Sequence, residues 1–383
     1  MIAIGLMSGT SLDGIDAALL KIEPRGSSYA FELLNFATVP FEPDLADRLR
    51  EALPPNEPGV QMLAQLHRRL GNAFARAARS VAGALNVDYV ASHGQTIRHD
   101  GPAHTSIQIG DAFLIREAMN ATVCYDFRSA DCAVGGHGAP LVPYIDALLF
   151  SDSLEDRIAL NIGGIANLTA LPAGGEVHDV MAFDIGPGNM LIDAFVRERT
   201  KHRHGWDPDG AFASAGRVDE AVLRAMESDP YFSKSSPKST GREHFGSQFL
   251  RGHDRLLAGL SLEDGCATLC ELTAATIADA VEEVKLKTAR ILCSGGGVKN
   301  LHLMERLAAR LPEARVESTD AYGVPADAKE AIAFAILGYE TLRERAANVP
   351  RVTGASRAVP LGAIAPVRLA ALLGEIERQC RSL

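Results

Sequence analysis

Apolar residues dominate three short runs in the first 40 positions, and polar or turn-forming residues separate these runs. This pattern predicts a meander of three strands, at residues 2–7, 16–22 and 29–39. From Leu63 to Leu85 the apolar residues instead recur every three or four positions, which predicts one long amphipathic helix. Further short apolar runs predict strands at residues 87–91, 106–109 and 122–125. The first part of the chain is therefore of α/β type.

The same order of elements recurs in the second half, without a repeat in the letters. Short strands are predicted at residues 157–161, 166–171 and 177–183, with Gly-rich turns between them. Helical patterns follow at residues 266–287 and 328–343, and an apolar strand at residues 291–293 separates them. Since 383 residues exceed what one hydrophobic core usually serves, we predict an α/β protein of two domains.

The domain boundary is predicted near residue 132, in the turn-rich stretch before Gly135. This boundary defines an N-terminal α/β domain, residues 1–132, and a C-terminal α/β domain, residues 133–383. The closing segment, residues 361–383, is helical in its period, and we expect it to pack back on the first domain.

The composition is that of an ordinary globular protein, with 47% hydrophobic and 22% charged residues. The net charge of −10 is spread along the chain, which argues against nucleic acid as a partner, because such binding needs a concentrated basic face. The chain does not start like a signal peptide, and no apolar stretch approaches the roughly 20 residues of a membrane span. We expect a cytoplasmic protein without a membrane partner.

Six cysteines are present, and two of them, Cys266 and Cys270, lie four residues apart on a predicted helix. No second close pair and no nearby histidine would supply the other ligands of a zinc site. We interpret the cysteines as buried, small apolar side chains.

The turn between the first two predicted strands, residues 5–16, carries the strongest chemical signal. Its Gly, Ser and Thr residues can bring N–H groups and hydroxyls together around an anion, and glycines at 5, 9 and 14 permit close backbone approach and positive φ. An ordinary Gly-rich turn is the alternative. We predict a phosphate clamp made of Gly9, Thr10, Ser11, Leu12, Asp13, Gly14, Ile15 and Asp16. Asp13 is expected to contact Mg²⁺ through water; an Asx turn is its alternative role.

Two further Gly-rich turns follow predicted strands. Asn161, Gly163 and Gly164 would form a second phosphate cradle. Gly295, Gly296 and Gly297 follow the strand at 291–293, where a flat purine ring could lie against the backbone. Each turn alone could equally be a tight connection between two elements, but the spacing of all three favours a nucleotide site.

Eight blocks of sequence, in order along nearly the whole chain, resemble those of the anhydro-N-acetylmuramic acid kinases, the sugar kinases of bacterial wall recycling. The blocks are residues 5–16, 92–96, 126–128, 135–143, 161–167, 184–189, 238–243 and 294–297. The resemblance implies the two-domain actin-like ATPase (sugar kinase) fold, with the nucleotide in the cleft between the domains. It also implies ATP and Mg²⁺ as cofactors, and an anhydro amino sugar as the small-molecule substrate. A homodimer stays open.

Asp184 is the carboxylate that we expect to act as the general base, placed at the end of a predicted strand. The residues that follow include Gly186, Gly188 and Asn189, which we assign to the nucleotide site. An Asp that only caps the turn is the alternative, and the resemblance favours the base. The family usually has a polar residue where this chain has Ile185.

The resemblance implies that several other polar and loop residues lie on the sugar side of the site. Among them, Arg128 could pair with the lactyl carboxylate of the substrate in a bidentate manner. The predicted substrate contacts are His93, Gln95, Thr96, Arg128, Gly138, Ala139, Pro140 and Glu330.

The reaction that the resemblance implies needs only one base. Asp184 would take a proton from the water that attacks C1 of the 1,6-anhydro sugar, while the bridging oxygen leaves toward the γ-phosphorus of ATP. The product would be N-acetylmuramic acid 6-phosphate. Two alternatives stay open: a conventional sugar kinase of the same fold that acts on a free hydroxyl, and a non-catalytic actin-like ATPase module.

Overall fold

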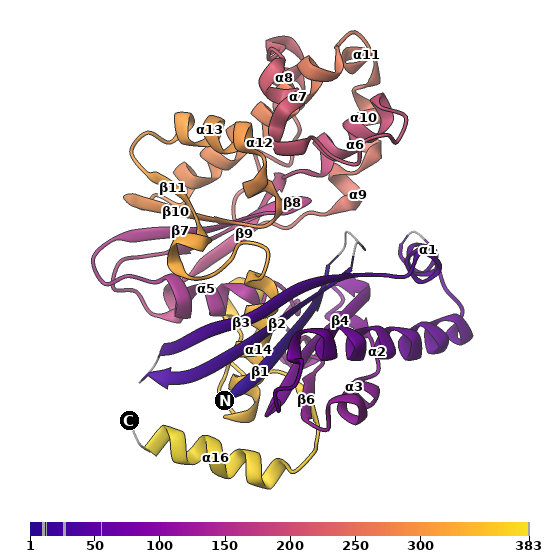
Figure 1. Cartoon of the computed structure of the whole chain (residues 1–383). Coiled ribbons are helices and arrows are strands. Elements are labelled where there is room, and N and C mark those ends of the chain that lie inside the picture. The colour runs from indigo at the N-terminus through magenta and orange to yellow at the C-terminus, as the bar shows by residue number, and fades with distance from the viewer. Residues whose placement is uncertain (10–11, 13, 26–27, 55, 382–383) are drawn as a thin grey trace. The chain divides into compact units, whose positions relative to one another are not determined.

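The computed structural model describes residues 1–9, 12, 14–25, 28–54 and 56–381. The chain forms two compact units (Figure 1): unit 1 is Met1–Leu149 with Ala328–Leu383, and unit 2 is Phe150–Asp327. This division differs from the boundary near residue 132 that the sequence suggested. The chain leaves unit 1 later than expected and returns to it, because the helix at Lys329–Leu342 packs on the first sheet.

Unit 1 contains a mixed sheet with the strand order β12-β6-β4-β1-β2-β3, and β5 pairs with β4. Strands β1, β2 and β3 are antiparallel, whereas β1, β4 and β6 run parallel. The strands are β1 (Ile2–Ser8), β2 (Gly14–Arg25), β3 (Ser28–Pro40), β4 (Tyr89–Asp100), β5 (Thr105–Ile109), β6 (Thr122–Tyr125) and β12 (Ala363–Ala365). The helices are α1 (Pro43–Ala52), α2 (Val60–Ala82), α3 (Ala112–Met119), α4 (Ser129–Ala133), α5 (Val142–Phe150), α14 (Lys329–Leu342), α15 (Pro350–Thr353) and α16 (Leu369–Arg381).

Unit 2 contains a five-stranded sheet with the order β11-β10-β7-β8-β9. The strands are β7 (Asp156–Ile162), β8 (Ile165–Leu171), β9 (Met181–Pro187), β10 (Thr288–Ser294) and β11 (Arg315–Ser318). The helices are α6 (Met190–Arg199), α7 (Ala211–Ala215), α8 (Glu220–Glu227), α9 (Arg242–Phe245), α10 (Ser247–Gly252), α11 (Asp254–Leu257), α12 (Leu262–Glu283) and α13 (Leu301–Arg310). Short 3₁₀ turns are η1 (Val177–Asp179), η2 (Pro208–Gly210), η3 (Gly296–Lys299) and η4 (Thr319–Tyr322).

The two sheets share one topology. In each, the first three strands form an antiparallel meander, and two later strands add in parallel beside the first strand. This duplicated α/β arrangement is the one expected of the actin-like ATPase and sugar kinase fold, so that expectation is confirmed.

Most of the predicted elements are confirmed within a few residues, including the meander, the long helix α2 and the helices α12 and α14. The predicted strand at residues 177–183 begins later, at Met181, after a 3₁₀ turn. The closing segment is not helical throughout: Ala363–Ala365 pairs with β6 before α16 begins. The segment packs in unit 1, as expected, and Figure 1 shows α16 in yellow at that end of the chain.

Helices α2 and α14 cover opposite faces of the unit 1 sheet. Ile4 and Leu6 of β1 pack in one buried cluster with the apolar stripe of α2. An added Cβ at Gly5, between them, would overlap the carbonyl oxygen of Ala331 in α14. Since successive strand residues point to opposite faces, Gly5 is the position that lets α14 lie directly on β1.

Four of the six cysteines are buried, Cys124, Cys266, Cys270 and Cys293, in agreement with their expected apolar role. Cys266 and Cys270 lie on α12, which is buried along most of its length in the core of unit 2. Burial raises the pKa of the Cys124, Cys266 and Cys270 thiols well above the ordinary range, so these groups stay protonated.

Candidate active site

Asp184 lies within strand β9, at the edge of the unit 2 sheet, and not after the end of a strand as predicted. Its backbone N–H donates to the carbonyl of Lys238 at 3.0 Å, and the N–H of Thr240 donates to its Oδ2 at 3.1 Å. The hydroxyl of Tyr231 donates to the Asp184 carbonyl at 2.7 Å. Residues 238–240 therefore pair with the free edge of β9 and hold both the backbone and the carboxylate of Asp184.

The environment of Asp184 makes its carboxylate a moderately strong base. Burial raises its pKa to about 6; the N–H of Thr240 opposes this rise, and the nearby Glu243 adds to it. A carboxylate with this pKa is ionised at pH 7, yet it accepts a proton more readily than an ordinary Asp does. The site can thus supply a general base from one side chain.

The three Gly-rich segments of unit 2 meet next to this strand. The N–H of Gly188 donates to the carbonyl of Gly164 at 2.9 Å, and the N–H of Asn189 donates to that of Gly163 at 2.9 Å. An added Cβ at Gly295, where φ is +82°, would lie 2.6 Å from Oδ1 of Asn161. The structure therefore brings together the segments 161–164, 186–189 and 295–297.

Glycine is needed in this cluster because the backbones approach closely. An added Cβ at Gly188 would overlap the Gly163 carbonyl, and one at Gly297 would overlap the side chain of Ile162. In the described part of the chain, the N–H groups of Gly163 and Gly164 donate to no backbone carbonyl. Unpaired backbone N–H groups in a Gly-rich turn are suited to phosphate oxygens.

The side chain of Ile185, between Asp184 and this cluster, points away from both. It is 1% exposed and belongs to the hydrophobic core of unit 2. An isoleucine at position 185, where the family usually has a polar residue, therefore affects the hydrophobic core beneath β9 and leaves the contacts of the Asp184 carboxylate unchanged.

The predicted clamp between β1 and β2 is described in part, because Thr10, Ser11 and Asp13 lie outside the described residues. Gly14 packs against β3, where an added Cβ would lie 2.5 Å from the carbonyl oxygen of Val39. Positive φ occurs in the described part of the turn at Leu12, with φ of 58°, and not at the glycines. Leu12 and Ile15 are buried in the core of unit 1, so their side chains stabilise the hairpin.

Gln95 joins the clamp to β4. Its Oε1 accepts from the hydroxyl of Ser8 at 2.6 Å, and its Nε2 donates to the carbonyl of Gly9 at 3.3 Å. The Ser8 hydroxyl also lies 3.0 Å from the carbonyl oxygen of Gly14, on the other side of the turn. The Gln95 side chain, predicted as a sugar contact, is thus engaged in holding the base of the hairpin.

A pair of carboxylates lies near the clamp in unit 1. Asp16 of β2 accepts from the hydroxyl of Thr38 at 2.6 Å. Burial raises the pKa of Glu330, the second residue of α14, and Asp16 raises it further, whereas Lys329 and Arg128 act in the opposite direction. Glu330 therefore shares one electrostatic environment with Asp16 and Arg128.

The buried side chain of His93 pairs with Arg128, which is partly buried. Nε2 of His93 accepts from Nε of Arg128 at 3.1 Å and lies 2.9 Å from Nη2, while Nη1 of Arg128 donates to the carbonyl of Gly138 at 2.8 Å. Burial, with the Arg128 charge, holds the pKa of His93 well below its usual range. The neutral imidazole then carries its proton on Nδ1, which donates to the carbonyl of Gly94 at 2.9 Å.

Arg128 keeps its positive charge in this environment. Burial lowers its pKa to about 10, and Glu330 acts against this decrease. Each terminal nitrogen of a guanidinium carries two hydrogens, so the contacts with His93 and Gly138 leave donors for a further acceptor. The loop residues Ala139 and Pro140 are partly or fully exposed beside Gly138.

We next compared the sequence of this chain with models of known protein families. The family model for anhydro-N-acetylmuramic acid kinase matches residues 1–367. The chain belongs to this family.

Curated family members match along almost their whole length. The chain is 46% identical over 375 residues to an anhydro-N-acetylmuramic acid kinase from Xanthomonas axonopodis pv. citri, with 95% of this chain and 97% of the relative covered. The same name is given to relatives from Streptomyces coelicolor, 41% identical with 96% and 94% covered, and from Clostridioides difficile, 40% identical with 96% and 98% covered.

Two groups that support the site in this family member were missed from the sequence. The first is the pair of contacts that hold Asp184: the side-chain hydroxyl of Tyr231 donates to its carbonyl, and the main-chain N–H of Thr240 donates to its carboxylate. The block 238–243 was noted for its resemblance to the family, but no role at Asp184 was predicted for it. The second is Asp131, which is fully buried and accepts from the N–H of Gly138 at 2.8 Å and from Asn348 and Thr353 at 2.6 and 2.7 Å. Asn348 and Thr353 lie more than 200 residues from Asp131 in the sequence, so spacing could not reveal these two contacts.

Thr96, predicted as a substrate contact, has a partner close in sequence: its hydroxyl accepts from Nε2 of Gln108 in β5 at 3.1 Å.

Among the described residues, no group of three or more His, Cys, Asp and Glu side chains could hold a metal ion. In the same part of the chain, no helix combines the length and apolar character that crossing a membrane requires.

Proposed function

We propose that this chain is an ATP-dependent kinase that opens 1,6-anhydro-N-acetylmuramic acid with water and phosphorylates O6, giving N-acetylmuramic acid 6-phosphate and ADP in cell-wall recycling. Family membership supports the substrate, since curated relatives that are 38–46% identical carry this name. The observation that carries the chemistry is the Asp184 carboxylate, which is held at the sheet edge with a pKa near 6.

Asp184 acts on water and not on a sugar hydroxyl. In the anhydro sugar, C1 and C6 share one oxygen, so there is no 6-hydroxyl to deprotonate. Asp184 takes a proton from the water that attacks C1, and a C1–O bond forms to that water. The bond between C1 and the bridging oxygen breaks, and this oxygen bonds to the γ-phosphorus as ADP leaves. A glycosidase needs an acid to protonate its leaving oxygen, but here the phosphoryl group captures it.

The Gly-rich cluster of unit 2 would hold the nucleotide phosphates. The N–H groups of Gly163 and Gly164 donate to no backbone carbonyl in the described part of the chain, and they offer main-chain donors without side-chain bulk close to Gly188 and Asn189. Such donors stabilise the charge on phosphate oxygens in a fixed geometry.

Mg²⁺ fits the carboxylate oxygens near the clamp of unit 1, where Asp16 and Glu330 share one electrostatic environment, although Lys329 and Arg128 also act on Glu330. We assign Asp13 to the ion, through water. When bound, Mg²⁺ neutralises charge on the transferring phosphoryl group.

On the sugar side, Arg128 would pair with the lactyl carboxylate of the substrate. Its guanidinium is fixed by His93 and the Gly138 carbonyl, and this fixed orientation lowers the entropy cost of binding a carboxylate. His93 stays neutral, so it does not compete with Arg128 for the anion.

Reaction in ¹⁸O-labelled water tests this mechanism. Label is expected in the C1 hydroxyl of the product, and none in the oxygen between C6 and phosphorus. Since water attacks from the face opposite the bridge, the α-anomer should be the first product before mutarotation. Label in the phosphate ester, a β-anomer as first product, or turnover of opened N-acetylmuramic acid at a comparable rate would contradict the coupled mechanism and favour a conventional kinase.

A further inference from the structure

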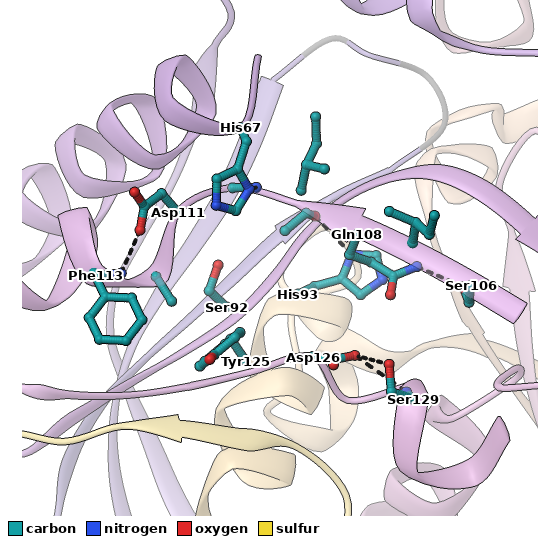
Figure 2. A pocket seen from close by; sticks show the side chains of 15 residues that line it. His67, Ser92, His93, Ser106, Gln108, Asp111, Phe113, Tyr125, Asp126 and Ser129 are labelled. Atoms are coloured by element: carbon teal, nitrogen blue, oxygen red, sulfur yellow. Dashed lines mark hydrogen bonds between the residues drawn. The ribbon is translucent and has the colours of Figure 1, made fainter. Parts of the chain in front are cut away.

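Unit 1 contains a cavity of about 360 Å³ to which the proposed reaction assigns no ligand, although His93 is part of its lining (Figure 2). Its lining comes from α2, from β4 and β5, from the start of α3 and from the segment after β6. The volume lies within the range of about 300–1,000 Å³ that is typical of small-molecule sites.

Two polar atoms of the lining have no hydrogen-bond partner in the part of the chain that the structure describes. Oγ of Ser92, a residue that is 2% exposed, has no hydrogen-bond partner among the described residues, and neither has Oε1 of Gln108. A buried polar atom without a partner is destabilising, because it has lost its hydrogen bonds to water without replacement. These atoms therefore offer a donor and acceptors to a ligand in the cavity.

The two carboxylates of the lining, those of Asp111 and Asp126, are each held by a hydrogen bond at the start of a helix. Oδ1 of Asp111 accepts from the N–H of Phe113 at 2.9 Å, at the start of α3. Oδ1 of Asp126 accepts from the hydroxyl of Ser129 at 2.7 Å, at the start of α4. The Oδ2 atom of each carboxylate can accept a hydrogen bond from a ligand hydroxyl.

The rim of the cavity is apolar. Phe113 is 48% exposed and Ile107 is 52% exposed, and both line this cavity. Arg116 lies against the Phe113 ring, with 4.8 Å between its guanidinium carbon and the ring centroid. An exposed, supported aromatic ring beside fixed polar groups is suited to the C–H face of a pyranose.

The charge of the lining selects against anions. No lysine or arginine is among the residues that line the cavity, whereas Asp111 and Asp126 are. A phosphate or carboxylate in this space would meet like charge from Asp111 and Asp126. Arg116 contacts Phe113 and Arg128 contacts His93, but neither arginine lines the cavity. A neutral ligand with several hydroxyls instead matches the acceptors of Asp111, Asp126 and Gln108 and the hydroxyl of Ser92.

We propose that this cavity is a second, non-catalytic binding site for a neutral saccharide of one ring. Ser92, Asp111 and Asp126 bind its hydroxyls, and Phe113 stacks on its apolar face. His93 lines the same cavity and also accepts from Arg128, so a bound saccharide contacts the pair assigned to substrate binding. The connection between this cavity and substrate binding rests on the proposed function, whereas the saccharide site itself does not.

Saturation-transfer NMR and calorimetry on the full chain test the site, with N-acetylglucosamine as the neutral probe and glucuronate as the anionic one. We expect N-acetylglucosamine to bind, and glucuronate to bind at least about tenfold more weakly. Phe113→Ala should weaken N-acetylglucosamine about tenfold, because an aromatic stacking contact contributes up to about that factor. Leu85→Ala is the matched control, since Leu85 is 52% exposed in unit 1 and does not line the cavity.

Ser92→Ala is a second variant: it removes only the Oγ atom from the lining of the cavity, and it should also weaken the binding of N-acetylglucosamine. Phe113→Ala should leave kinase turnover of the anhydro sugar unchanged. Absent binding of N-acetylglucosamine, equal binding of glucuronate, or binding that neither variant weakens would overturn the site. Loss of the anhydro sugar's own binding in Phe113→Ala would also overturn it, by showing that the cavity is the substrate site. Saccharide binding without kinase activity would support this site while contradicting the proposed function.

Discussion

Replacing Asp184 by Asn tests the base and its environment together. The amide keeps the shape of the carboxylate and an oxygen that can accept from the N–H of Thr240, but it cannot take a proton. We expect kcat to fall by about 10²–10⁴-fold, the usual contribution of a general base. The KM for ATP should stay within a few-fold, because the Gly-rich cluster is unchanged.

The pKa of Asp184 also sets the pH dependence of the parent. With a pKa of about 6, the carboxylate is ionised and active above this pH and protonated below it. The kcat/KM of the parent should therefore rise with pH and level off above about pH 6 to 7.

The same substitution should stabilise the fold at neutral pH. A rise of the pKa from 3.8 to about 6 corresponds to at most about 3 kcal/mol, and less because the side chain keeps some solvent contact. Since the folded-state pKa is raised, the stabilising contribution is full below pH 3.8 and is lost as pH rises through 6. Asp184→Asn should therefore exceed the parent in free energy of unfolding at pH 7 to 8, and this gain should shrink toward pH 4.

Asp193→Asn is the matched control. Asp193 lies on α6 in the same unit, and burial raises its pKa to about 6 as well. The two variants should show the same sign of stability change in denaturant titrations at several pH values, whereas only Asp184→Asn should lose activity. If Asp184→Asn turned over within a few-fold of the parent at saturating substrates, the assignment of the base would be refuted. An equal loss of activity in Asp193→Asn would mean that burial of charge, and not base catalysis, governs turnover.

Three further predictions test other parts of the molecule. Gly188→Ala places a Cβ on a backbone carbonyl and should raise the KM for ATP at least about tenfold in steady-state kinetics, whereas Gly259→Ala, with open space around it, should not; equal values would remove the phosphate site from this cluster. Arg128→Lys should raise the KM for the sugar and leave the KM for ATP unchanged, because lysine lacks the planar fork; an unchanged sugar KM would refute its role. Gly5→Ala should lower the free energy of unfolding by about 1–3 kcal/mol in urea titrations, and a neutral result would contradict the tight contact between β1 and α14.

The periodic elements were predictable because each has one dominant environment. The apolar stripe of α2 faces a single core, and the meander strands are separated by turn residues, so local pattern and final structure agree. The return of the chain to unit 1 at Ala328 was not predictable in this way. It depends on Gly5 and Gly338, whose small size lets α14 lie on β1 and β4, and this is a contact between residues that are distant in sequence.

The residues of the candidate site also fall into two groups: those that the sequence could indicate and those that only the folded chain brings together. Asp184 and the Gly-rich turns carry their signal in the residue types themselves, so the sequence pointed to them. Main-chain groups such as the N–H of Thr240 carry no such signal, since any residue except proline provides one. The burial that raises the pKa of Asp184 comes from the folded unit as a whole, so it could not be predicted from the residues beside it.

The duplicated topology explains why no letter repeat marks the two halves. Both sheets need apolar strands in the order of a meander followed by parallel strands, and many sequences satisfy that requirement. The chemistry differs at equivalent places. The turn after the first strand carries Gly9 in unit 1 and Gly163 in unit 2. The parallel pairing with the first strand ends at Gln95, within β4, in one sheet and at Ser294, just before Gly295, in the other. The carboxylate lies on the second strand in unit 1, as Asp16, and on the third strand in unit 2, as Asp184. The two units thus share a packing pattern but carry different polar groups, and function has to be argued from those groups and not from the fold.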